Sequence, residues 1–454
     1  MTDINHITHI YFLGIGGIGM SALARYFHTR GVSVSGYDKS PSRLTGELQE
    51  EGIRVFHADD PATLEVMPEL VVYTPAIPSS NQLFRHFSSH QIPMKKRAEV
   101  LGMISQGIPT IAVAGTHGKT TISTMLTHIL KVAGIPCVSF LGGISTNYNS
   151  NYIGDPDPKW MVAEADEFDR SFLQLSPHLA LISSIDTDHL DIYGSSEALT
   201  ENFASFANKI HPDGVLVHKK GIAEKINFNG KHYSYHPFEM ADYRLKDVEI
   251  CQGRYKATIE GAICIEELKP GHPGMHNLEN ALGAAALAHQ AGVSAEKIRE
   301  ALSSFNGVRR RFEICFQTEK RIYVDDYAHH PEEIRACIAS ARAMWPGKKI
   351  TGVFQPHLFS RTKQLADEFA ESLSALDELI LMDIYPAREA PIEGVSAQMI
   401  LNRVKLQQAM YCPREKLLDL LGKRETEVLL TMGAGDIDRF AGSITQLLKN
   451  KALS

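Results

Sequence analysis

The 454-residue sequence lacks several features that mark specialised classes of protein. It has no run of about 18 apolar residues, so no membrane-spanning helix is expected. Residues 1–9 are mostly polar, with no basic stretch leading into an apolar one, which argues against a secretory signal. The six cysteines lie far apart without a Cys-x-x-Cys pair, so neither a disulfide framework nor a zinc knuckle is indicated. These absences predict a cytoplasmic protein with reduced thiols.

Basic residues are also not in excess. The chain has 46 Lys and Arg against 53 Asp and Glu, a net charge of −7. The chain therefore lacks the overall excess of positive charge that binding to a nucleic-acid phosphate backbone favours, and nucleic acid is not an expected partner. Residues 107–307 contain 23 acidic and 16 basic groups, whereas residues 1–106 and 308–454 are nearly neutral. The net negative charge therefore comes from residues 107–307.

The length corresponds to about three domains of roughly 150 residues each. Apolar runs alternate with helical periodicity, which is typical of α/β folds with parallel sheets. We predict three α/β domains: a Rossmann-like domain over residues 1–106, a central P-loop ATPase-like domain over residues 107–307, and a second Rossmann-like domain over residues 308–454. Strands are predicted at residues 9–13, 32–37, 70–73, 110–114, 160–163, 178–185, 322–324, 350–354, 378–382 and 428–432, and helices at 20–28, 120–133 and 280–291.

A first glycine-rich turn follows the predicted strand 9–13 and opens a helix. Gly14, Gly16 and Gly19 have the spacing of a dinucleotide fingerprint, and Asp38 lies about 20 residues further on. Read literally, this pattern indicates an NAD-dependent oxidoreductase. Physically, the glycines indicate only that a backbone turn approaches a phosphate at a helix N-terminus, so any nucleotide diphosphate satisfies them.

A second glycine-rich loop, residues 114–121, follows an apolar strand and also opens a helix. Such a loop offers backbone amides to phosphates, a lysine to the β and γ oxygens and a hydroxyl to Mg²⁺. Val113 replaces the leading glycine of the strict P-loop pattern. The loop predicts ATP and Mg²⁺ as ligands, with these candidate residues: Gly115, Thr116, His117, Gly118, Lys119, Thr120 and Thr121.

A P-loop needs an acidic metal partner, and nine carboxylates lie between Asp155 and Asp191. Glu164 ends a predicted strand, where a carboxylate is well placed to hold Mg²⁺, and His189 is a further candidate ligand. A solvated acidic loop is the alternative. The short Asp-x-x-Gly pattern at residues 191–194 also fits a GTP switch, but the guanine-reading Asn-Lys-x-Asp is absent from the sequence.

The last third carries three polar segments: residues 309–311, 325–331 and 355–362. The last two follow predicted strands, so arginine, histidine and acid are expected to gather along one sheet edge and to face a phosphate or carboxylate ligand. Taken alone, paired histidines before a proline are more typical of a turn.

Together, these motifs in this order resemble the Mur ligase family, the ATP-dependent amide-forming enzymes of peptidoglycan assembly. The resemblance covers nearly the whole chain and rests on residues 114–121, 164–167, 188–191, 276–280, 311–313 and 325–331. Within the family, residues 14–20, 355–362 and 385–392 are similar to the branch that adds the first amino acid, L-alanine, to UDP-N-acetylmuramate.

The resemblance implies a cytoplasmic ligase, monomeric or weakly dimeric, that activates the carboxylate of UDP-N-acetylmuramate as an acyl phosphate and joins it to L-alanine. It implies that residues 1–106 bind the UDP-sugar, residues 107–307 bind ATP and residues 308–454 close over it. The UDP-sugar would meet Gly14, Gly16, Gly17, Gly19, Asp38, Arg97, Tyr327 and His329.

For the nucleotide and metals, the resemblance implies that Lys119 grips the phosphates and that Thr120, Glu164 and His189 hold Mg²⁺. Asn280, with Asn277, would meet adenine. Contacts to the nucleotide, the acyl phosphate and the alanine would come from Arg311, Asp326, Tyr327, His329 and Arg361.

Two positions depart from the family pattern. Leu358 stands where the alanine-adding branch typically has arginine, which puts the contacts of Arg361 in doubt. Ala204 lies where later-acting members carry a carbamylated lysine, which agrees with the alanine-adding branch. A related ligase that attaches a recycled tripeptide to the same sugar is the nearest alternative.

Overall fold

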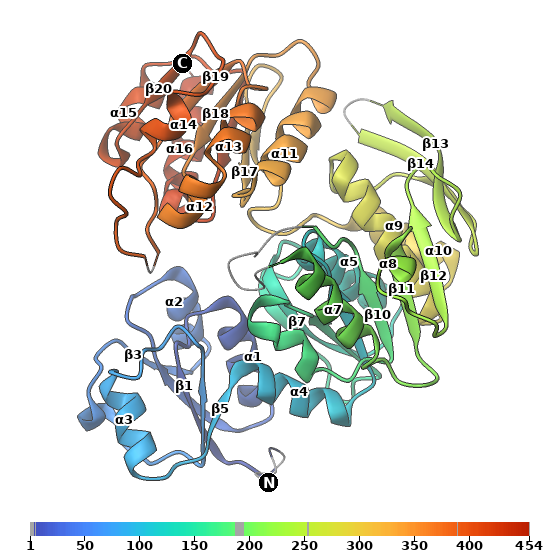
Figure 1. Cartoon of the computed structure of the whole chain (residues 1–454), viewed down its shortest axis with the longest axis vertical. Coiled ribbons are helices and arrows are strands. Elements are labelled where there is room, and N and C mark those ends of the chain that lie inside the picture. The colour runs from blue at the N-terminus through green and yellow to red at the C-terminus, as the bar shows by residue number, and fades with distance from the viewer. Residues whose placement is uncertain (1–3, 5, 187–194, 252–253, 388, 454) are drawn as a thin grey trace. The chain divides into compact units, whose positions relative to one another are not determined.

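The computed structural model describes residues 4, 6–186, 195–251, 254–387 and 389–453. The strands of these residues form three sheets that follow one another along the chain, as Figure 1 shows. The mixed α/β architecture predicted from the sequence is confirmed.

The first sheet is parallel throughout and has the strand order β3-β2-β1-β4-β5. Alternate residues of β1 enter two different apolar clusters, Ile10 and Phe12 on one face and Tyr11 and Leu13 on the other. Burial on both faces explains why this strand is an unbroken apolar run. The elements are β1 (His9–Leu13), α1 (Ile18–His28), β2 (Ser33–Tyr37), α2 (Arg43–Glu50), β3 (Arg54–Phe56), η1 (Pro61–Thr63), β4 (Leu70–Tyr73), α3 (Gln82–Ser89), β5 (Met94–Lys96) and α4 (Arg97–Gly107).

The second sheet has ten strands in the order β15-β14-β13-β12-β11-β10-β6-β9-β7-β8. Its strand β6 lies between β9 and β10, and both pairings are parallel. The carboxyl ends of these three strands therefore meet at one edge, where the chain order reverses. The strands are β6 (Thr110–Ala114), β7 (Cys137–Ser145), β8 (Ser150–Gly154), β9 (Trp160–Glu164), β10 (Leu179–Ile182), β11 (Val215–Lys219), β12 (His232–His236), β13 (Tyr243–Cys251), β14 (Arg254–Gly261) and β15 (Ile265–Leu268). The helices in this part of the chain are α5 (Lys119–Val132), η2 (Phe168–Gln174), α7 (Ser196–Ala207), α8 (Ile222–Lys225), α9 (Met275–Gln290) and α10 (Ala295–Ser304).

The third sheet has the order β16-β17-β21-β18-β19-β20, and all its pairings are parallel except that of β16. Helices α11 and α13 lie side by side on it (Figure 1). The strands are β16 (Glu313–Gln317), β17 (Ile322–Asp326), β18 (Ile350–Phe354), β19 (Glu378–Leu381), β20 (Ala409–Tyr411) and β21 (Val428–Met432). The helices are α11 (Pro331–Met344), α12 (Phe359–Gln364), α13 (Ala366–Leu373), α14 (Gln398–Leu401), η3 (Arg414–Lys416), α15 (Leu417–Gly422), η4 (Asp436–Phe440) and α16 (Ala441–Leu453).

By its internal contacts the chain divides into two compact units. The first contains residues 1–247, 257–268 and 279–305, and the second contains residues 248–256, 269–278 and 306–454. One apolar cluster runs through both sheets of the first unit and joins Val100 and Ile104 of α4 to Phe172 of η2. The proposed domain boundaries near residues 106 and 307 stay a prediction.

A buried polar contact also joins the two sheets of the first unit. Asn151 of β8 is fully buried, and its amide nitrogen donates to the Ile18 carbonyl and to the Ser21 hydroxyl, the latter at 2.9 Å. Its amide oxygen accepts from Arg25, whose guanidinium also donates to Glu51. The N-terminal turn of α1 is thus fixed to the second sheet.

The predicted strands at 9–13, 70–73, 110–114, 350–354 and 428–432 have the observed bounds. The hairpin β7–β8 and most of the segment from β11 to β15 were not predicted. Among the described residues, no helix combines the length and apolar character of a membrane span.

Candidate active site

The second glycine-rich loop connects β6 to α5, as the sequence predicted. Gly115 and Gly118 have φ angles of +127° and +83°, a region that favours glycine. A Cβ atom at Gly115 would lie 2.1 Å from the Ser183 hydroxyl, and one at Gly118 would lie 2.5 Å from the Asn280 side-chain oxygen. The loop therefore needs glycine at both positions, and the Asn280 amide of α9 packs directly against it.

Lys119 is the first residue of α5, and its ammonium group is held between the loop and the acidic segment after β9. Its Nζ donates to the Gly115 carbonyl at 2.6 Å and to the two carboxylate oxygens of Glu167 at 3.0 and 2.9 Å. Burial lowers the pKa of Lys119, but the carboxylates of Glu167, Asp166 and Glu164 outweigh it, so the pKa lies above its ordinary value. Lys119 therefore remains a cation at neutral pH.

Thr120 and Glu164 form the part of the site that fits a metal. The Thr120 hydroxyl donates to both carboxylate oxygens of Glu164 at 3.0 Å. Glu164 is brought there by the parallel pairing of β6 and β9, in which it lies beside Val113. The carboxylate also packs on Gly142 of β7, where a Cβ atom would lie 1.9 Å from its Oε2.

Hydroxyl and carboxylate oxygens are the donors that Mg²⁺ prefers. Within the described ranges there is no cluster of three or more His, Cys, Asp or Glu side chains that could hold a metal. His189, the other predicted ligand, lies outside the described residues, as does the 191–194 segment weighed for a GTP switch.

The residues that follow β10 support the rest of the loop. The Thr116 and Ser184 hydroxyls lie 2.7 Å apart, and the Ser184 hydroxyl accepts from the His117 amide at 3.1 Å. The Thr116 hydroxyl also accepts from the amide of Asp186 at 3.2 Å. Thr121 is buried in the first turn of α5. The predicted loop residues are thus brought together by β6, β9 and β10.

The first glycine-rich turn lies at the carboxyl edge of the first sheet. Gly14 has a φ of +88°, and its amide donates to the Tyr37 carbonyl at 2.7 Å. The Asp38 carboxylate accepts from the Gly16 amide at 2.9 Å, and a Cβ atom at Gly19 would lie 2.5 Å from a guanidinium nitrogen of Arg97. The turn also includes Gly17, the N-cap of α1. The structure therefore brings these predicted residues to one place.

The second unit gathers the predicted polar side chains at the carboxyl ends of β17 and β18. The Asp326 carboxylate accepts from the amides of Phe312 and Ala328, both at 2.7 Å, and burial raises its pKa to about 7. The Arg311 guanidinium lies 4.9 Å from the centre of the Tyr327 ring. Cation and aromatic ring are close enough to attract one another.

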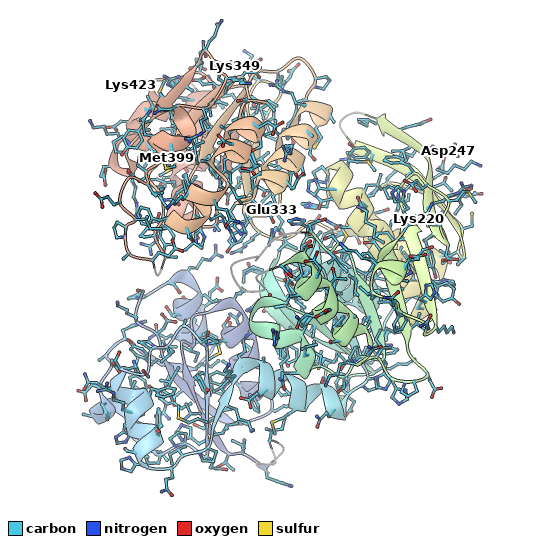
Figure 2. The ribbon with its side chains drawn as sticks, viewed as in Figure 1. Lys220, Asp247, Glu333, Lys349, Met399 and Lys423 are labelled. Carbon is cyan, nitrogen blue, oxygen red and sulfur yellow. The ribbon has the colours of Figure 1, made fainter. Side chains whose placement is uncertain are left out.

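His329 lies in the same segment, and its spacing in the sequence does not by itself indicate a role. Its amide donates to the Glu333 carboxylate of α11 at 3.0 Å, and Glu333 is labelled in Figure 2. Burial lowers the pKa of His329 to about 4, while Glu333 opposes the shift and Arg361 and Arg311 add to it. His329 is therefore neutral at pH 7, and Arg361 of α12 lies near enough to affect it.

Three further predicted positions can be placed. Asn277 is buried, and its side-chain amide donates to the Pro273 carbonyl at 2.6 Å. Leu358 precedes α12 with a φ of +70°, and its backbone amide donates to the Tyr385 backbone carbonyl at 2.9 Å. Ala204 packs against the apolar cluster of the first unit.

Three family models match the chain in succession. The model described as the Mur ligase family catalytic domain matches residues 9–108, the middle domain matches residues 113–288, and the glutamate ligase domain matches residues 310–435. The chain belongs to the Mur ligase family.

Relatives with a similar sequence match this Mur ligase over nearly its full length. UDP-N-acetylmuramate–L-alanine ligases of Parabacteroides distasonis and Flavobacterium johnsoniae are each 46% identical to it over 98% of the chain and 98% and 99% of the relative. The crystal structure of the UDP-N-acetylmuramate-alanine ligase from Thermotoga maritima matches with a TM-score of 0.85 and 29% identity, over 98% of this chain and all of that one.

Sequence reasoning missed several residues of this Mur ligase site. In the sequence, Glu167 is only one of several acids after β9, yet both its carboxylate oxygens accept from Lys119. Ser184 and Gly142 carry no local motif, since their role comes from the pairing of strands distant in sequence. Glu333, two residues into α11 beyond Pro331, could have been found from its capping position.

Proposed function

We propose that this Mur ligase joins L-alanine to the carboxylate of UDP-N-acetylmuramate with conversion of ATP to ADP and phosphate, as a step of peptidoglycan precursor synthesis. The full-length identity to ligases with this name carries the proposal. Because ATP and UDP-sugars are cytoplasmic metabolites, we also propose that the enzyme acts in the cytoplasm, as a monomer or weak homodimer.

The nucleotide is proposed to bind at the loop between β6 and α5, with Asn280 near the adenine. The loop amides and Lys119 offset the charge of the phosphate oxygens, which is the main demand of phosphoryl transfer. This assignment is supported by the two left-handed glycines and by the position of Lys119 at the start of a helix. Lys119 would exchange its present carboxylate partner for the phosphates.

Mg²⁺ is part of the proposal. The oxygen donors of Thr120 and Glu164 fit the ion, and His189 is proposed as a ligand to a second ion with Glu164. When bound, the ion supplies charge neutralisation to the phosphate oxygens. The chain's own contribution is to hold the Glu164 carboxylate against Thr120 and Gly142, so that this oxygen cluster is preformed.

The UDP-sugar is proposed to bind at the first glycine-rich turn. The backbone of Gly14, Gly16, Gly17 and Gly19 is proposed to approach its pyrophosphate and the guanidinium of Arg97 to neutralise it, while Asp38 keeps the turn in shape through the Gly16 amide. These contacts of the turn suit any nucleotide diphosphate and do not select a nicotinamide cofactor. The oxidoreductase hypothesis also gives the second glycine-rich loop no role.

Two chemical steps follow. A muramoyl carboxylate oxygen attacks the γ-phosphorus, the bond to the β–γ bridging oxygen breaks, and ADP leaves. The neutral amine of alanine then attacks the acyl carbon, the C–O bond to the phosphate breaks in the tetrahedral intermediate, and the proton that the nitrogen loses leaves with the phosphate as HPO4²⁻. Arg311, Asp326, Tyr327, His329 and Arg361 are proposed to meet the nucleotide, the acyl phosphate and the alanine, with residues 308–454 excluding water that would hydrolyse the acyl phosphate.

The experiment that tests this function measures phosphate release by the purified chain with ATP, Mg²⁺ and UDP-N-acetylmuramate, comparing the twenty amino acids. Release that depends on L-alanine is expected. Release only with the recycled tripeptide would assign the chain to the related tripeptide ligases, and binding of a nicotinamide cofactor at micromolar concentration without ATP turnover would overturn the proposal.

A further inference from the structure

The two residues that follow β10, Ser183 and Ser184, are joined to the second glycine-rich loop by backbone hydrogen bonds in both directions. The Ser183 amide donates to the Ala114 carbonyl at 3.0 Å, and the Thr116 amide donates to the Ser184 carbonyl at 3.2 Å. The backbones are in direct contact, because a Cβ atom at Gly115 would lie 2.9 Å from the Ser184 amide nitrogen. The loop is therefore fixed to this segment and not merely adjacent to it.

The side chain of Ser184 extends these contacts into a chain of hydrogen bonds. The His117 amide donates to the Ser184 hydroxyl at 3.1 Å, and the hydroxyls of Ser184 and Thr116 lie 2.7 Å apart. The Thr116 hydroxyl lies 3.3 Å from a carboxylate oxygen of Asp186, which is an acceptor only. All three contacts are satisfied at once when Ser184 donates to Thr116 and Thr116 donates to the carboxylate. Ser184 therefore links a loop amide to a charged group.

The amides of Thr116 and His117 thus already have acceptors in the protein. The His117 carbonyl is held as well, because it accepts from the Ser183 hydroxyl. Turning the two amides toward a phosphate would break hydrogen bonds on successive peptide groups, each of which contributes to stability. The amides of residues 119–121 differ, since they are the first of α5 and have no acceptor inside the helix. The loop divides its amides between holding the backbone and meeting the phosphates.

We propose that Ser184 is a positioning residue for the nucleotide: its hydroxyl holds the peptide groups of Thr116 and His117 in place and leaves the amides of residues 119–121 to the phosphates. This inference rests on the proposed binding of ATP at this loop. Ser184 is assigned no contact with substrate and no proton transfer. In the opposite arrangement, in which the amides of Thr116 and His117 turn to the phosphates, Ser184 competes with the phosphates. The two arrangements therefore predict opposite effects when the Ser184 hydroxyl is removed.

The variant that tests the role of the hydroxyl is Ser184→Ala in the full-length chain, with binding of ADP and of AMP measured by calorimetry in the presence of Mg²⁺. The backbone bonds are kept and the hydroxyl is lost, so ADP should bind about three- to tenfold more weakly, the range for one neutral hydrogen bond. AMP lacks the β-phosphate that such a loop meets, so its affinity should change by less than about twofold. A general loss of structure would weaken both ligands alike.

Two further variants complete the test. Ser184→Thr keeps a hydroxyl at the same position and should bind ADP within about twofold of the wild type, whereas a loss equal to that of Ser184→Ala would overturn the role of the hydroxyl. The matched control is Ser205→Ala on α7. There an exposed serine hydroxyl donates to the Glu201 carbonyl at 2.9 Å, and its removal should leave the affinities for ADP and AMP as in the wild type.

The outcomes separate this inference from the proposed function. If the wild type does not bind ADP, the proposed ATP site fails whatever Ser184 does. If the wild type binds ADP and Ser184→Ala binds it equally well or more tightly, the positioning role is wrong, and tighter binding would assign the amides of Thr116 and His117 to the phosphates. Equal weakening of ADP and AMP would also overturn it.

If Ser184→Ala does not fold, Thr116→Val replaces it, because this change removes the next hydroxyl of the chain with little change in shape. ADP should then bind more weakly by a similar factor, with AMP again little affected. An unchanged ADP affinity in Thr116→Val would overturn the inference.

Discussion

Gly142 of β7 lies in no sequence motif, yet the position of the Glu164 carboxylate, which we propose as a Mg²⁺ ligand, requires that residue 142 has no side chain. A Cβ atom at this position would lie 1.9 Å from Oε2 and 2.7 Å from Cδ of Glu164. Ordinary contact begins near 3.4 Å, so the carboxylate has to move by about 1.5 Å in Gly142→Ala. Both Thr120 to Glu164 hydrogen bonds, now 3.0 Å, would then be broken.

A displacement of about 1 Å in a catalytic group costs on the order of a hundredfold in rate. We therefore expect Gly142→Ala to lower kcat for phosphate release about a hundredfold and to raise the Mg²⁺ concentration needed for half-maximal rate. Because the atom that must move is the end of a flexible side chain, the free energy of unfolding should change by less than about 1 kcal/mol. The assay is phosphate release over a Mg²⁺ titration, with urea unfolding in parallel.

The matched control is Gly46→Ala in the middle of α2, where a Cβ atom would meet nothing within 4 Å. It should leave turnover unchanged and stabilise the helix by about 0.5–1 kcal/mol. A Gly142→Ala enzyme within threefold of wild-type kcat, at the same Mg²⁺ requirement, would refute the placement of Glu164 as a preformed metal ligand.

Three other changes have expected outcomes. Lys119→Ala should lower phosphate release by about a thousandfold and leave UDP-N-acetylmuramate binding within twofold, measured by calorimetry, and near wild-type turnover would contradict the assignment of the glycine loop. Asn151→Ala removes the partner of buried Arg25 and of the Ile18 carbonyl, so urea unfolding should show a loss of about 3 kcal/mol, and a loss below about 0.5 kcal/mol would show that the contact is replaced by water. Burial lowers the pKa of His272 from 6.5 to about 4, so its contribution to stability is present above pH 6.5 and is lost as the pH falls toward 4, at about 1.4 kcal/mol per pH unit. His272→Gln should therefore reduce the stability difference between pH 7 and pH 5 by about 2 kcal/mol, and an unchanged difference would show that this histidine is not the group that titrates.

Much of the fold was predictable because the parallel strands of the sheet centres are buried on both faces. Such strands read as unbroken apolar runs, and the glycine loops that follow β1 and β6 then mark their carboxyl ends. The positions of Lys119 and Thr120 followed from that pattern. By contrast, β13 and β14 contain many charged residues and were missed, although apolar side chains alternate along them.

The partners of the site residues were less predictable than the residues themselves. Several acids follow β9, and which of them faces Lys119 depends on the course of the chain as it enters η2, not on spacing. The position of Glu164 beside the glycine loop could be predicted because β9 ends there. The ion pair of Glu167 with Lys119 could not be predicted. Gly142 and Ser184 act only through strands that are distant in sequence, so no local pattern indicates them.

The apolar cluster that passes from α4 to η2 determines where the chain can be divided. The backbone approach is close, since a Cβ atom at Gly102 would lie 2.5 Å from the Gln174 carbonyl oxygen. A fragment ending at residue 106 would expose Val100 and Ile104 to water, and the complementary fragment would expose Phe172. Chimeras between related ligases should therefore exchange residues 1–106 together with the segment that follows them, with the junction near residue 306 and not near 106.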